Sequence, residues 1–231
     1  MRRSPATMAA LLVVAGVLCA GLIGLGIWQI ERLSWKRALI ASVEQRVHAA
    51  PVLAPGPDRW ATVSAAQDGY RHVRVAGRYR DTATVFVQAV TERGPGFWAM
   101  TPLLSDRGFT VLINRGFVTT RQAPAGGAAS VSGLLRPSEP GGGFLRRNDP
   151  AANRWYSRDV AAIAAAQRLG RVAPYFIDAD AGPPGSRPVG GLTVIRFPNN
   201  HLVYALTWFV LAAMVAGAGA MLVRSQRRGA A

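Results

Sequence analysis

Two long apolar runs without a charged residue most constrain how this chain can fold. The first spans residues 8–27 and the second spans residues 202–223 of a 231-residue chain. A helix rises about 1.5 Å per residue, so roughly 20 residues cross the ~30 Å hydrocarbon layer of a membrane. The sequence therefore predicts transmembrane helices at 8–27 and 199–223, with most of the chain between them.

The first apolar run has an alternative interpretation as a signal peptide, because Arg2 and Arg3 precede it. The apolar core of a signal peptide is about 7–15 residues long, which is shorter than this run. No small-x-small cleavage site follows at a sensible distance, and Leu18 occupies the place of the small residue that precedes a lipoprotein cysteine. We therefore favour a membrane helix that contains Cys19, the only cysteine, so no internal disulfide is expected.

Charge indicates an orientation for the two helices. The formal net charge is +15, and both short tails, 1–7 and 224–231, carry arginines. The positive-inside rule places these tails in the cytoplasm and the large central segment outside, although Arg32, Lys36 and Arg37 lie on the outer side. Nucleic acid is therefore not an expected partner. The positive outer segment instead suits anionic lipid headgroups, haem propionates or an acidic protein.

The segment after the first membrane helix is expected to stay helical. Residues 28–50 contain no Gly or Pro, and Leu39, Val43 and Val47 recur at four-residue spacing. Trp28 and Trp35 suit the membrane interface, where indole rings lie between lipid and water. We expect a helical extension over 28–50 and a stiff, Pro-rich linker over 51–59.

Residues 60–198 change to the pattern of short strands and predict an extracytoplasmic β-rich domain. One helix is expected at 158–169, with Ser157 as its N-cap and Gly170 at its end. The fold class is thus a membrane protein of α+β type: two transmembrane helices flank a mainly antiparallel sheet or partial barrel with a small helix. The expected strands are 70–79, 82–90, 97–104, 109–118, 131–135, 175–177 and 192–195.

Small residues recur at four-residue spacing in both membrane helices. The first helix carries Gly16, Ala20 and Gly24, and the second carries three alanines at 212, 216 and 220. Such a stripe allows two helices to approach closely. Chance spacing in an alanine-rich sequence is an equally good interpretation.

No constellation of an enzyme appears in the sequence, which contains no HExxH, CxxC, P-loop or serine-elbow motif. Asp178 and Asp180 are better explained as a strand end and a turn than as metal ligands. The loop 148–156 leads into Trp155 and Tyr156, which either anchor the following helix or form part of a docking face. His48 and His72 have no second ligand candidate at useful spacing, so we interpret both as structural or surface residues.

His201 differs from the other histidines because it lies at the start of a membrane helix, after Asn199 and Asn200, either of which can act as N-cap. His201, Tyr204 and Trp208 have i, i+3, i+7 spacing and share one helix face. The positive helix N-terminus favours neutral imidazole, the form that ligates iron. An interfacial histidine that contacts lipid explains the same pattern, so the residues alone leave both interpretations open.

The chain resembles the Surfeit locus protein 1 family of cytochrome c oxidase assembly factors, and four segments carry the resemblance in order. They are Gly24-Leu-Gly-Ile-Trp-Gln29 with Arg32, Trp35 and Lys36; Val111-Leu-Ile-Asn-Arg-Gly-Phe-Val118; Asn148-Asp-Pro-Ala-Ala-Asn-Arg-Trp-Tyr-Ser-Arg-Asp159; and Asn199-Asn-His-Leu-Val-Tyr-Ala-Leu-Thr-Trp208. Phe117 replaces the more usual Trp of the second motif. Together with the two spans, the resemblance covers essentially the whole chain.

The resemblance implies a non-enzymatic protein of the bacterial inner membrane that helps to build haem-copper oxidases. It implies haem a binding and delivery toward the oxidase catalytic subunit, alongside other assembly factors. It leaves open whether two copies share one haem as a homo-oligomer. A cofactor-free scaffold that stabilises an oxidase assembly intermediate is the alternative function.

The resemblance also assigns site residues. His201 is the candidate ligand of the haem iron, with Tyr204 and Trp208 on the same helix face. The glycines Gly24 and Gly26 and the Trp28-Gln29 pair would shape the other wall of the site. Arginines such as Arg32 and Arg196 are expected to pair with the haem propionates.

Overall fold

A computed structural model describes residues 4–143, 145–195 and 197–228 of the chain. The chain divides into two compact units. The first, here called the helical unit, contains Met1–Ser42 and Arg196–Ala231, and the second, the sheet unit, contains Val43–Ile195. The helical unit carries both apolar runs, so the division follows the change of pattern that the sequence shows.

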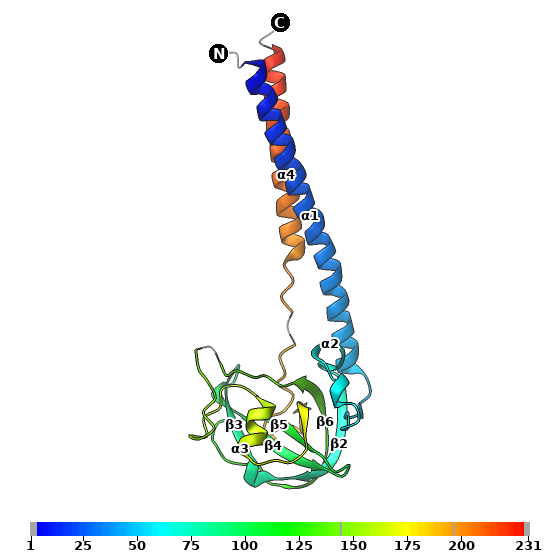
Figure 1. Ribbon diagram of the computed structural model, residues 1–231, viewed down its shortest axis with the longest axis vertical. Coiled ribbons are helices and arrows are strands. Elements are labelled where there is room, and N and C mark those ends of the chain that lie inside the picture. The colour runs from blue at the N-terminus through cyan, green and yellow to red at the C-terminus, as the bar shows by residue number, and fades with distance from the viewer. Residues whose placement is uncertain (1–3, 144, 196, 229–231) are drawn as a thin grey trace. The chain divides into compact units, whose positions relative to one another are not determined.

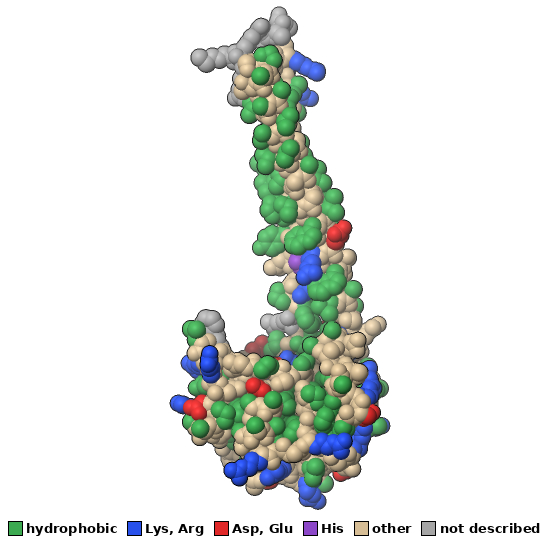
Figure 2. Space-filling model, in the orientation of Figure 1, with side chains coloured by type: hydrophobic (Ala, Val, Ile, Leu, Met, Phe, Trp, Pro, Cys, Tyr) green, Lys and Arg blue, Asp and Glu red, His purple; other side chains and the backbone are tan. Residues whose placement is uncertain are grey.

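Both predicted membrane helices are present. Helix α1 spans Pro5–His48, which includes the expected extension beyond the apolar run, and helix α4 spans His201–Arg228. Only 6% of the most apolar stretch of each helix is buried inside the protein, unlike the core helix of a water-soluble domain. Such a continuous apolar surface requires a surrounding that is also apolar, which a membrane supplies (Figure 2).

The two helices run antiparallel side by side, so that the start of α1 and the end of α4 lie at the same end of the pair (Figure 1). The shielded residues of α4 recur at alternating spacings of four and three, and α1 shows a closely similar pattern. This is the heptad pattern of knobs-into-holes packing. On α1 the seam contains Leu11, Ala15, Cys19, Leu22, Gly26, Gln29 and Leu33; on α4 it contains His201, Ala205, Trp208, Ala212, Val215, Gly219 and Leu222.

The small-residue stripe is therefore not the contact face. Gly16, Ala20 and Gly24 are exposed, and so are Ala216 and Ala220, whereas Ala212 is buried. A strict four-residue spacing drifts around a helix of 3.6 residues per turn, but alternating spacings of four and three keep residues on one seam. The seam also admits larger side chains, because Gly26 leaves room for the ring of Phe209.

An engineered cysteine tests this seam. The Cys19 Sγ lies 3.7 Å from the Ala212 carbonyl oxygen, so Ala212→Cys is expected to form a disulfide with Cys19 within one chain under mild oxidation. The measurement is the loss of maleimide-reactive thiols with unchanged monomer mobility. The matched control is Ala216→Cys, one turn away and exposed, which should keep both thiols. Equal cross-linking of the two variants would contradict the seam.

The sheet unit contains seven strands in the order β1-β2-β6-β7-β5-β4-β3, and β2 also pairs with β4. That extra pairing bends the sheet back on itself, which confirms the predicted partial barrel. All neighbours are antiparallel except β1–β2 and β5–β7. The strands are β1 Val52–Leu53, β2 His72–Tyr79, β3 Val85–Thr91, β4 Gly94–Ser105, β5 Thr110–Val118, β6 Gly127–Pro137 and β7 Val172–Ala179.

Two expectations for this unit need correction. Residues 192–195, which we expected to be a strand, have no regular structure, because β7 is already paired on one side with β5 and on the other with β6. The expected linker 51–59 carries β1 and enters the core: Ala54 is buried, and the Pro55 carbonyl accepts hydrogen bonds from Trp60 and Tyr175.

The small helix is shorter than expected and has a different cap. Helix α3 spans Val160–Ala166, and Asp159 is its N-cap, with a side-chain oxygen that accepts from the Ala162 backbone N–H. Ser157 instead accepts hydrogen bonds from the Gly142 N–H and from the Asn148 side chain. The remaining helical turns are η1 Trp60–Thr62, α2 Ala65–Asp68 and η2 Asp81–Ala83.

The loop before α3, residues 148–156, is anchored in the core of the sheet unit through Trp155. Trp155 is 1% exposed and packs with Val87, Leu112 and Ile163 in one of the two core clusters. Asn148 holds the loop closed, since its side-chain oxygen accepts from the backbone N–H groups of Tyr156 and Ser157. For Trp155 the structure thus supports the anchoring interpretation.

Candidate functional site

His201 is the first residue of α4, and its ring is tied to the neighbouring helix. The His201 Nδ1 atom lies 2.8 Å from the side-chain oxygen of Gln29 on α1. Gln29 is 9% exposed, and His201 is half-buried. The two residues are far apart in sequence and meet only because the helices are antiparallel and share a seam.

The predicted aromatic residues occupy different positions around this pair. Trp208 lies on the α4 seam and is half-buried. Tyr204 is 55% exposed and Trp28 is 53% exposed, so both face outward from the helical unit. Spacing alone grouped Tyr204 with His201 and Trp208. In the structure, His201, Ala205 and Trp208 lie on the seam, and Tyr204 lies outside it.

The two predicted glycines differ from each other. Gly26 is buried on the seam, and a Cβ at this position would lie 2.5 Å from a ring carbon of Phe209. Gly24 is exposed, with nothing within 4 Å of a Cβ placed there. The packing explains Gly26 as a helix-contact residue, whereas Gly24 leaves open space on the outer surface of α1.

The predicted arginines and the helix entry complete this region. The Arg32 guanidinium lies 4.2 Å from the Trp35 ring centre, so it is held along α1. Arg196 lies outside the described residues. Asn200 precedes α4, and its carbonyl accepts from the Tyr204 N–H. The buried side-chain oxygen of Asn199 has no hydrogen-bond partner among the described residues, and is therefore open to a donor.

The donor chemistry around His201 fits an iron ligand. With the Gln29 oxygen facing Nδ1, a neutral His201 ring makes this hydrogen bond only in the tautomer that carries its proton on Nδ1, which leaves the lone pair on Nε2. Among the described residues, Nε2 makes no hydrogen bond. Within the same part of the chain, no cluster of three or more His, Cys, Asp or Glu side chains could hold a metal ion directly.

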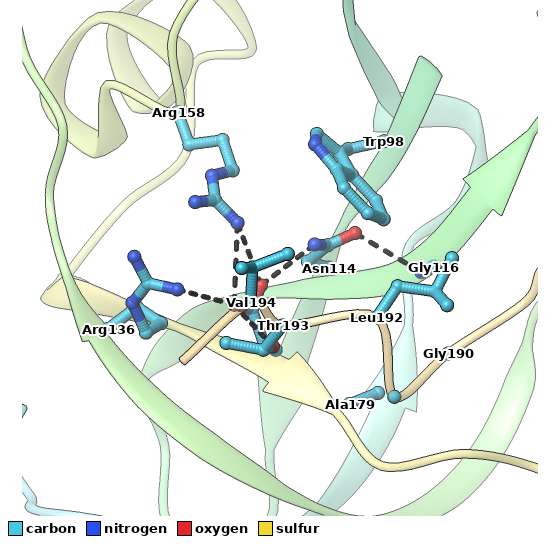
Figure 3. Close-up of a pocket in the computed structure, with 12 residues that line it drawn as sticks. Trp98, Asn114, Gly116, Arg136, Arg158, Ala179, Gly190, Leu192, Thr193 and Val194 are labelled. Carbon is cyan, nitrogen blue, oxygen red and sulfur yellow. Dashed lines mark hydrogen bonds and ion pairs between the residues drawn. The ribbon is translucent and has the colours of Figure 1, made fainter. Parts of the chain in front are cut away.

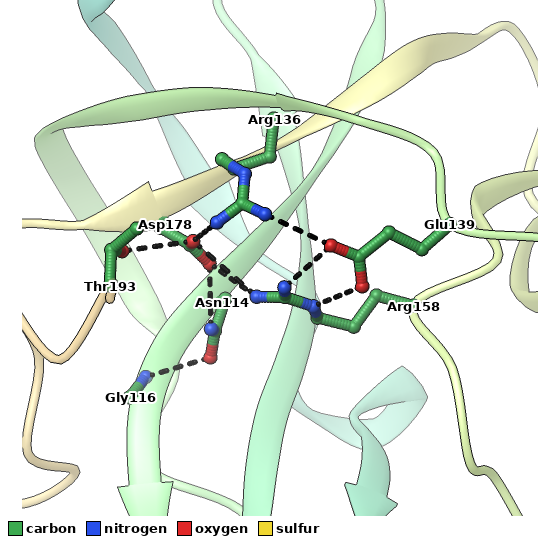
Figure 4. A network of polar contacts seen from close by, with 7 residues as sticks. All are labelled: Asn114, Gly116, Arg136, Glu139, Arg158, Asp178 and Thr193. Atoms are coloured by element: carbon green, nitrogen blue, oxygen red, sulfur yellow. Dashed lines mark hydrogen bonds and ion pairs between the residues drawn. The ribbon is translucent and has the colours of Figure 1, made fainter. Parts of the chain in front are cut away.

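A second polar cluster, in the sheet unit, was not predicted from the sequence. Asp178 on β7 is 4% exposed in its side chain and accepts hydrogen bonds from the side chains of Arg136, Arg158, Asn114 and Thr193 (Figure 4). Glu139 accepts from both arginines, at 3.1 Å from Arg136 and 2.7 Å from Arg158. We call these six residues the Asp178 network.

The network balances its own charge, with two arginines against two carboxylates. Burial by itself lowers the pKa of Arg158, but the charges of Asp178 and Glu139 outweigh it and raise that pKa. A buried charge is tolerated when it is paired and hydrogen-bonded, and both conditions hold here. The network therefore binds strands β5, β6 and β7 and the segment around Thr193 into one structure.

Two of the four sequence motifs converge on this network. Asn114 belongs to the 111–118 motif: its amide donates to Asp178 and its oxygen accepts from the Gly116 N–H. Gly116 has φ of +124°, a backbone conformation that favours glycine. Arg158 belongs to the 148–159 motif. The signal that could have found the network was the pair of buried-strand polar residues, Asn114 and Asp178.

A cavity of about 180 Å³ lies beside the network, lined by Trp98, Asn114, Leu192 and Val194 together with both arginines (Figure 3). Phe117, where the resemblance expects Trp, packs edge-on against Trp98 with ring centres 6.1 Å apart. The cavity is therefore bordered by the fully paired Asp178 network and by the aromatic ring of Trp98.

The other two histidines have structural partners. The His72 ring bridges the Asp180 carboxylate and the Ala49 carbonyl. Burial opposes the charged form, but these two hydrogen bonds outweigh it and raise the pKa of His72. The His48 Nδ1 atom lies 2.9 Å from the Glu44 carbonyl within α1. These hydrogen bonds explain both histidines as structural residues.

Comparison with known proteins relates these features to a family. The sequence model of the SURF1 family matches residues 16–213. Surfeit locus protein 1 of Mus musculus is 33% identical over 216 residues, which cover 82% of this chain and 68% of the mouse protein. The Homo sapiens protein is also 33% identical, with 82% of this chain and 70% of the human protein covered.

A third relative matches over a longer stretch. The SURF1-like protein of Monosiga brevicollis is 34% identical over 228 residues, which cover 89% of this chain and 84% of that protein. The family match begins within α1 and ends within α4, so it includes part of each apolar helix and the whole sheet between them. With this two-helix, one-sheet architecture and identity across most of its length, the chain belongs to the SURF1 family.

Proposed function

We propose that this protein is an assembly factor for a haem-copper oxidase and that it receives haem a at His201 for delivery to the catalytic subunit. Family membership supports the assembly role. The observation that supports the cargo is the His201–Gln29 pair, which leaves one imidazole nitrogen without a proton at a helix mouth. Iron in haem is held by such a nitrogen.

Haem a, when bound, would supply an iron that an imidazole nitrogen can hold and an apolar ring with ionised propionates. His201 holds the iron in this proposal. The exposed rings of Tyr204 and Trp28 offer apolar surface near His201, and Trp208 lies about 10 Å further along α4. Arg32 and Arg196 are the candidate partners of the propionates, and Arg32 leaves its ring contact with Trp35 to serve there.

The proposal includes an orientation in a bacterial inner membrane. The two helices form an antiparallel pair, so both tails face the same side, and Arg224, Arg227 and Arg228 mark it as cytoplasmic. The sheet unit and His201 then face the outside, where the oxidase catalytic subunit and other assembly factors are the expected partners.

A cofactor-free scaffold is the second candidate function. It is favoured by two large apolar side chains of the sheet unit, Val90 and Leu145, which are 88% and 90% exposed. A large apolar side chain that lies in water gains free energy when a protein partner covers it. In this case the outer surface of the sheet unit, rather than His201, would hold an oxidase intermediate.

An absorption spectrum separates the two functions. The full chain, purified from cells that make haem a, is expected to carry haem, and His201→Ala is expected to lose at least about nine-tenths of it because the iron ligand is gone. The matched control is His48→Ala, which should keep the haem. Unchanged haem in the His201 variant would overturn the ligand assignment. Absence of haem in the unaltered protein would favour the scaffold.

A further inference from the structure

We infer that Gln29 is a positioning residue that holds the proton of the His201 ring on Nδ1 and so keeps Nε2 open for iron. The inference rests on the proposed function for the identity of the metal. The assignment of the proton rests on the Gln29 amide atom that faces Nδ1, which is the oxygen. Gln29 would then act on the ligand through one hydrogen bond and touch neither iron nor haem itself.

The position of the proton follows from the chemistry of two atoms, His201 Nδ1 and the side-chain oxygen of Gln29. They lie 2.8 Å apart, the ordinary length of a hydrogen bond. A side-chain amide oxygen has lone pairs and no hydrogen, so it can only accept. The imidazole nitrogen must therefore be the donor. Neutral histidine in water carries its proton mostly on Nε2, so Gln29 selects the less common tautomer.

Gln29 lies in an otherwise apolar stretch of the α1 seam. Its neighbours along the α1 seam are Leu22, Gly26 and Leu33, all apolar. A buried amide in such a place is unfavourable unless it is hydrogen-bonded. His201 is the partner that the structure shows for the Gln29 side chain. A leucine would fill the seam without this requirement, so packing alone does not explain a glutamine here.

The tautomer of His201 decides which ring nitrogen can bind iron. A histidine that binds a metal usually donates its other ring N–H to an acceptor, which fixes the ring orientation and makes the ligating nitrogen more basic. Gln29 provides that acceptor before any metal is present. The imidazole is therefore pre-organised, and no ring rotation or proton transfer is needed when the iron arrives.

The reverse arrangement makes a distinct prediction. If the Gln29 amide were turned so that its NH₂ group donated to Nδ1, the ring proton would lie on Nε2. That tautomer cannot bind iron through Nε2. The pair would then be an interhelical contact that sets the register of α1 and α4, as buried polar residues do in coiled coils.

The test is ¹⁵N NMR of the haem-free, full-length chain with ¹⁵N-labelled histidine in detergent micelles. The measurement is made about two pH units above the ordinary histidine pKa of about 6.5, a pH at which free imidazole is neutral. The signals of His201 are identified as those missing from the His201→Ala variant. We expect the Nδ1–H form to dominate at His201 in the unaltered protein.

Variants of Gln29 provide the second arm. Gln29→Met keeps a similar volume but removes the acceptor, so the ratio of Nδ1–H to Nε2–H should fall roughly tenfold, as loss of one hydrogen bond predicts. Gln29→Glu retains an accepting oxygen and should restore the Nδ1–H form. Gln45→Met, at an exposed glutamine of the same helix, is the matched control and should leave the ratio unchanged.

Haem titration provides the third arm. Gln29→Met is expected to weaken haem binding about 10- to 100-fold, the usual effect of removing the partner of a metal-bound histidine, while Gln29→Glu keeps most of the affinity. A dominant Nε2–H form in the unaltered protein, or a ratio that Gln29→Met does not change, would overturn the inference. The Nδ1–H form together with no haem binding would overturn the proposed cargo and still support the proton assignment.

Discussion

Asp178→Ala is expected to lower the free energy of unfolding of the sheet unit by about 3–5 kcal/mol. The substitution removes the carboxylate that receives Arg136 and Arg158, whose side chains are only 15% and 14% exposed. Glu139 alone then faces two guanidinium groups that remain largely buried. Asn114 and Thr193 also lose their acceptor, so the unpaired groups add to the loss.

Pulse proteolysis of the full chain across a urea series measures this effect, because cleavage follows the unfolded fraction of the sheet unit. Asp106→Ala is the control: Asp106 is an exposed aspartate in the β4–β5 hairpin loop, and its substitution should change the stability by no more than about 0.5 kcal/mol. A similar small change at Asp178 would show that the Asp178 network does not stabilise the unit.

Trp155→Ala is expected to destabilise the sheet unit by about 3–5 kcal/mol, the usual result of removing a large buried aromatic side chain. Trp155 is 1% exposed, and its indole N–H donates to the Asn153 side chain. Loss of the ring leaves a cavity against Val87, Leu112 and Ile163, although the hydrogen bond from the Gln88 N–H to the backbone carbonyl of residue 155 remains. Trp155→Phe retains most of the apolar volume and should be milder.

The same urea series serves for Trp155, with Leu104→Ala as the control, because Leu104 is a 57% exposed residue of the same sheet. If Trp155 belonged to a docking face rather than the core, Trp155→Ala would weaken a partner's binding and leave the unfolding midpoint in place. That outcome would overturn the anchoring interpretation of the loop.

Elements with a strong local pattern were predictable. Both apolar helices, the helical extension to His48, and the strands that became β2, β4 and β5 all follow from periodicity and turn residues. Two predictions that depended on long-range pairing were wrong. The strand at 192–195 found no free edge beside β7, and the N-cap of α3 moved to Asp159 once Ser157 was bonded to Asn148.

In the candidate site, too, the local pattern was predictable and the long-range partner was not. His201 stood out in the sequence as a histidine at a membrane-helix mouth, and the resemblance supplied the haem. Its partner Gln29 is 172 residues away. No local pattern indicates which residue of α1 faces His201, and only the resemblance placed Gln29 in the opposite wall of the site. The small-residue spacing pointed to the wrong faces of the helices, because residue size alone does not define a seam.

The sequence by itself determined the environment and the secondary structure of each segment. Two uncharged apolar runs require a membrane, and alternating β-formers require a sheet. Those requirements are local, since they follow from the solvation of each side chain and the period of the backbone. The tertiary structure decided which buried polar groups meet. Asp178 joins Asn114, Arg136 and Arg158, and Gln29 joins His201, because a buried polar group must find its partner in the folded chain, wherever that partner lies in the sequence.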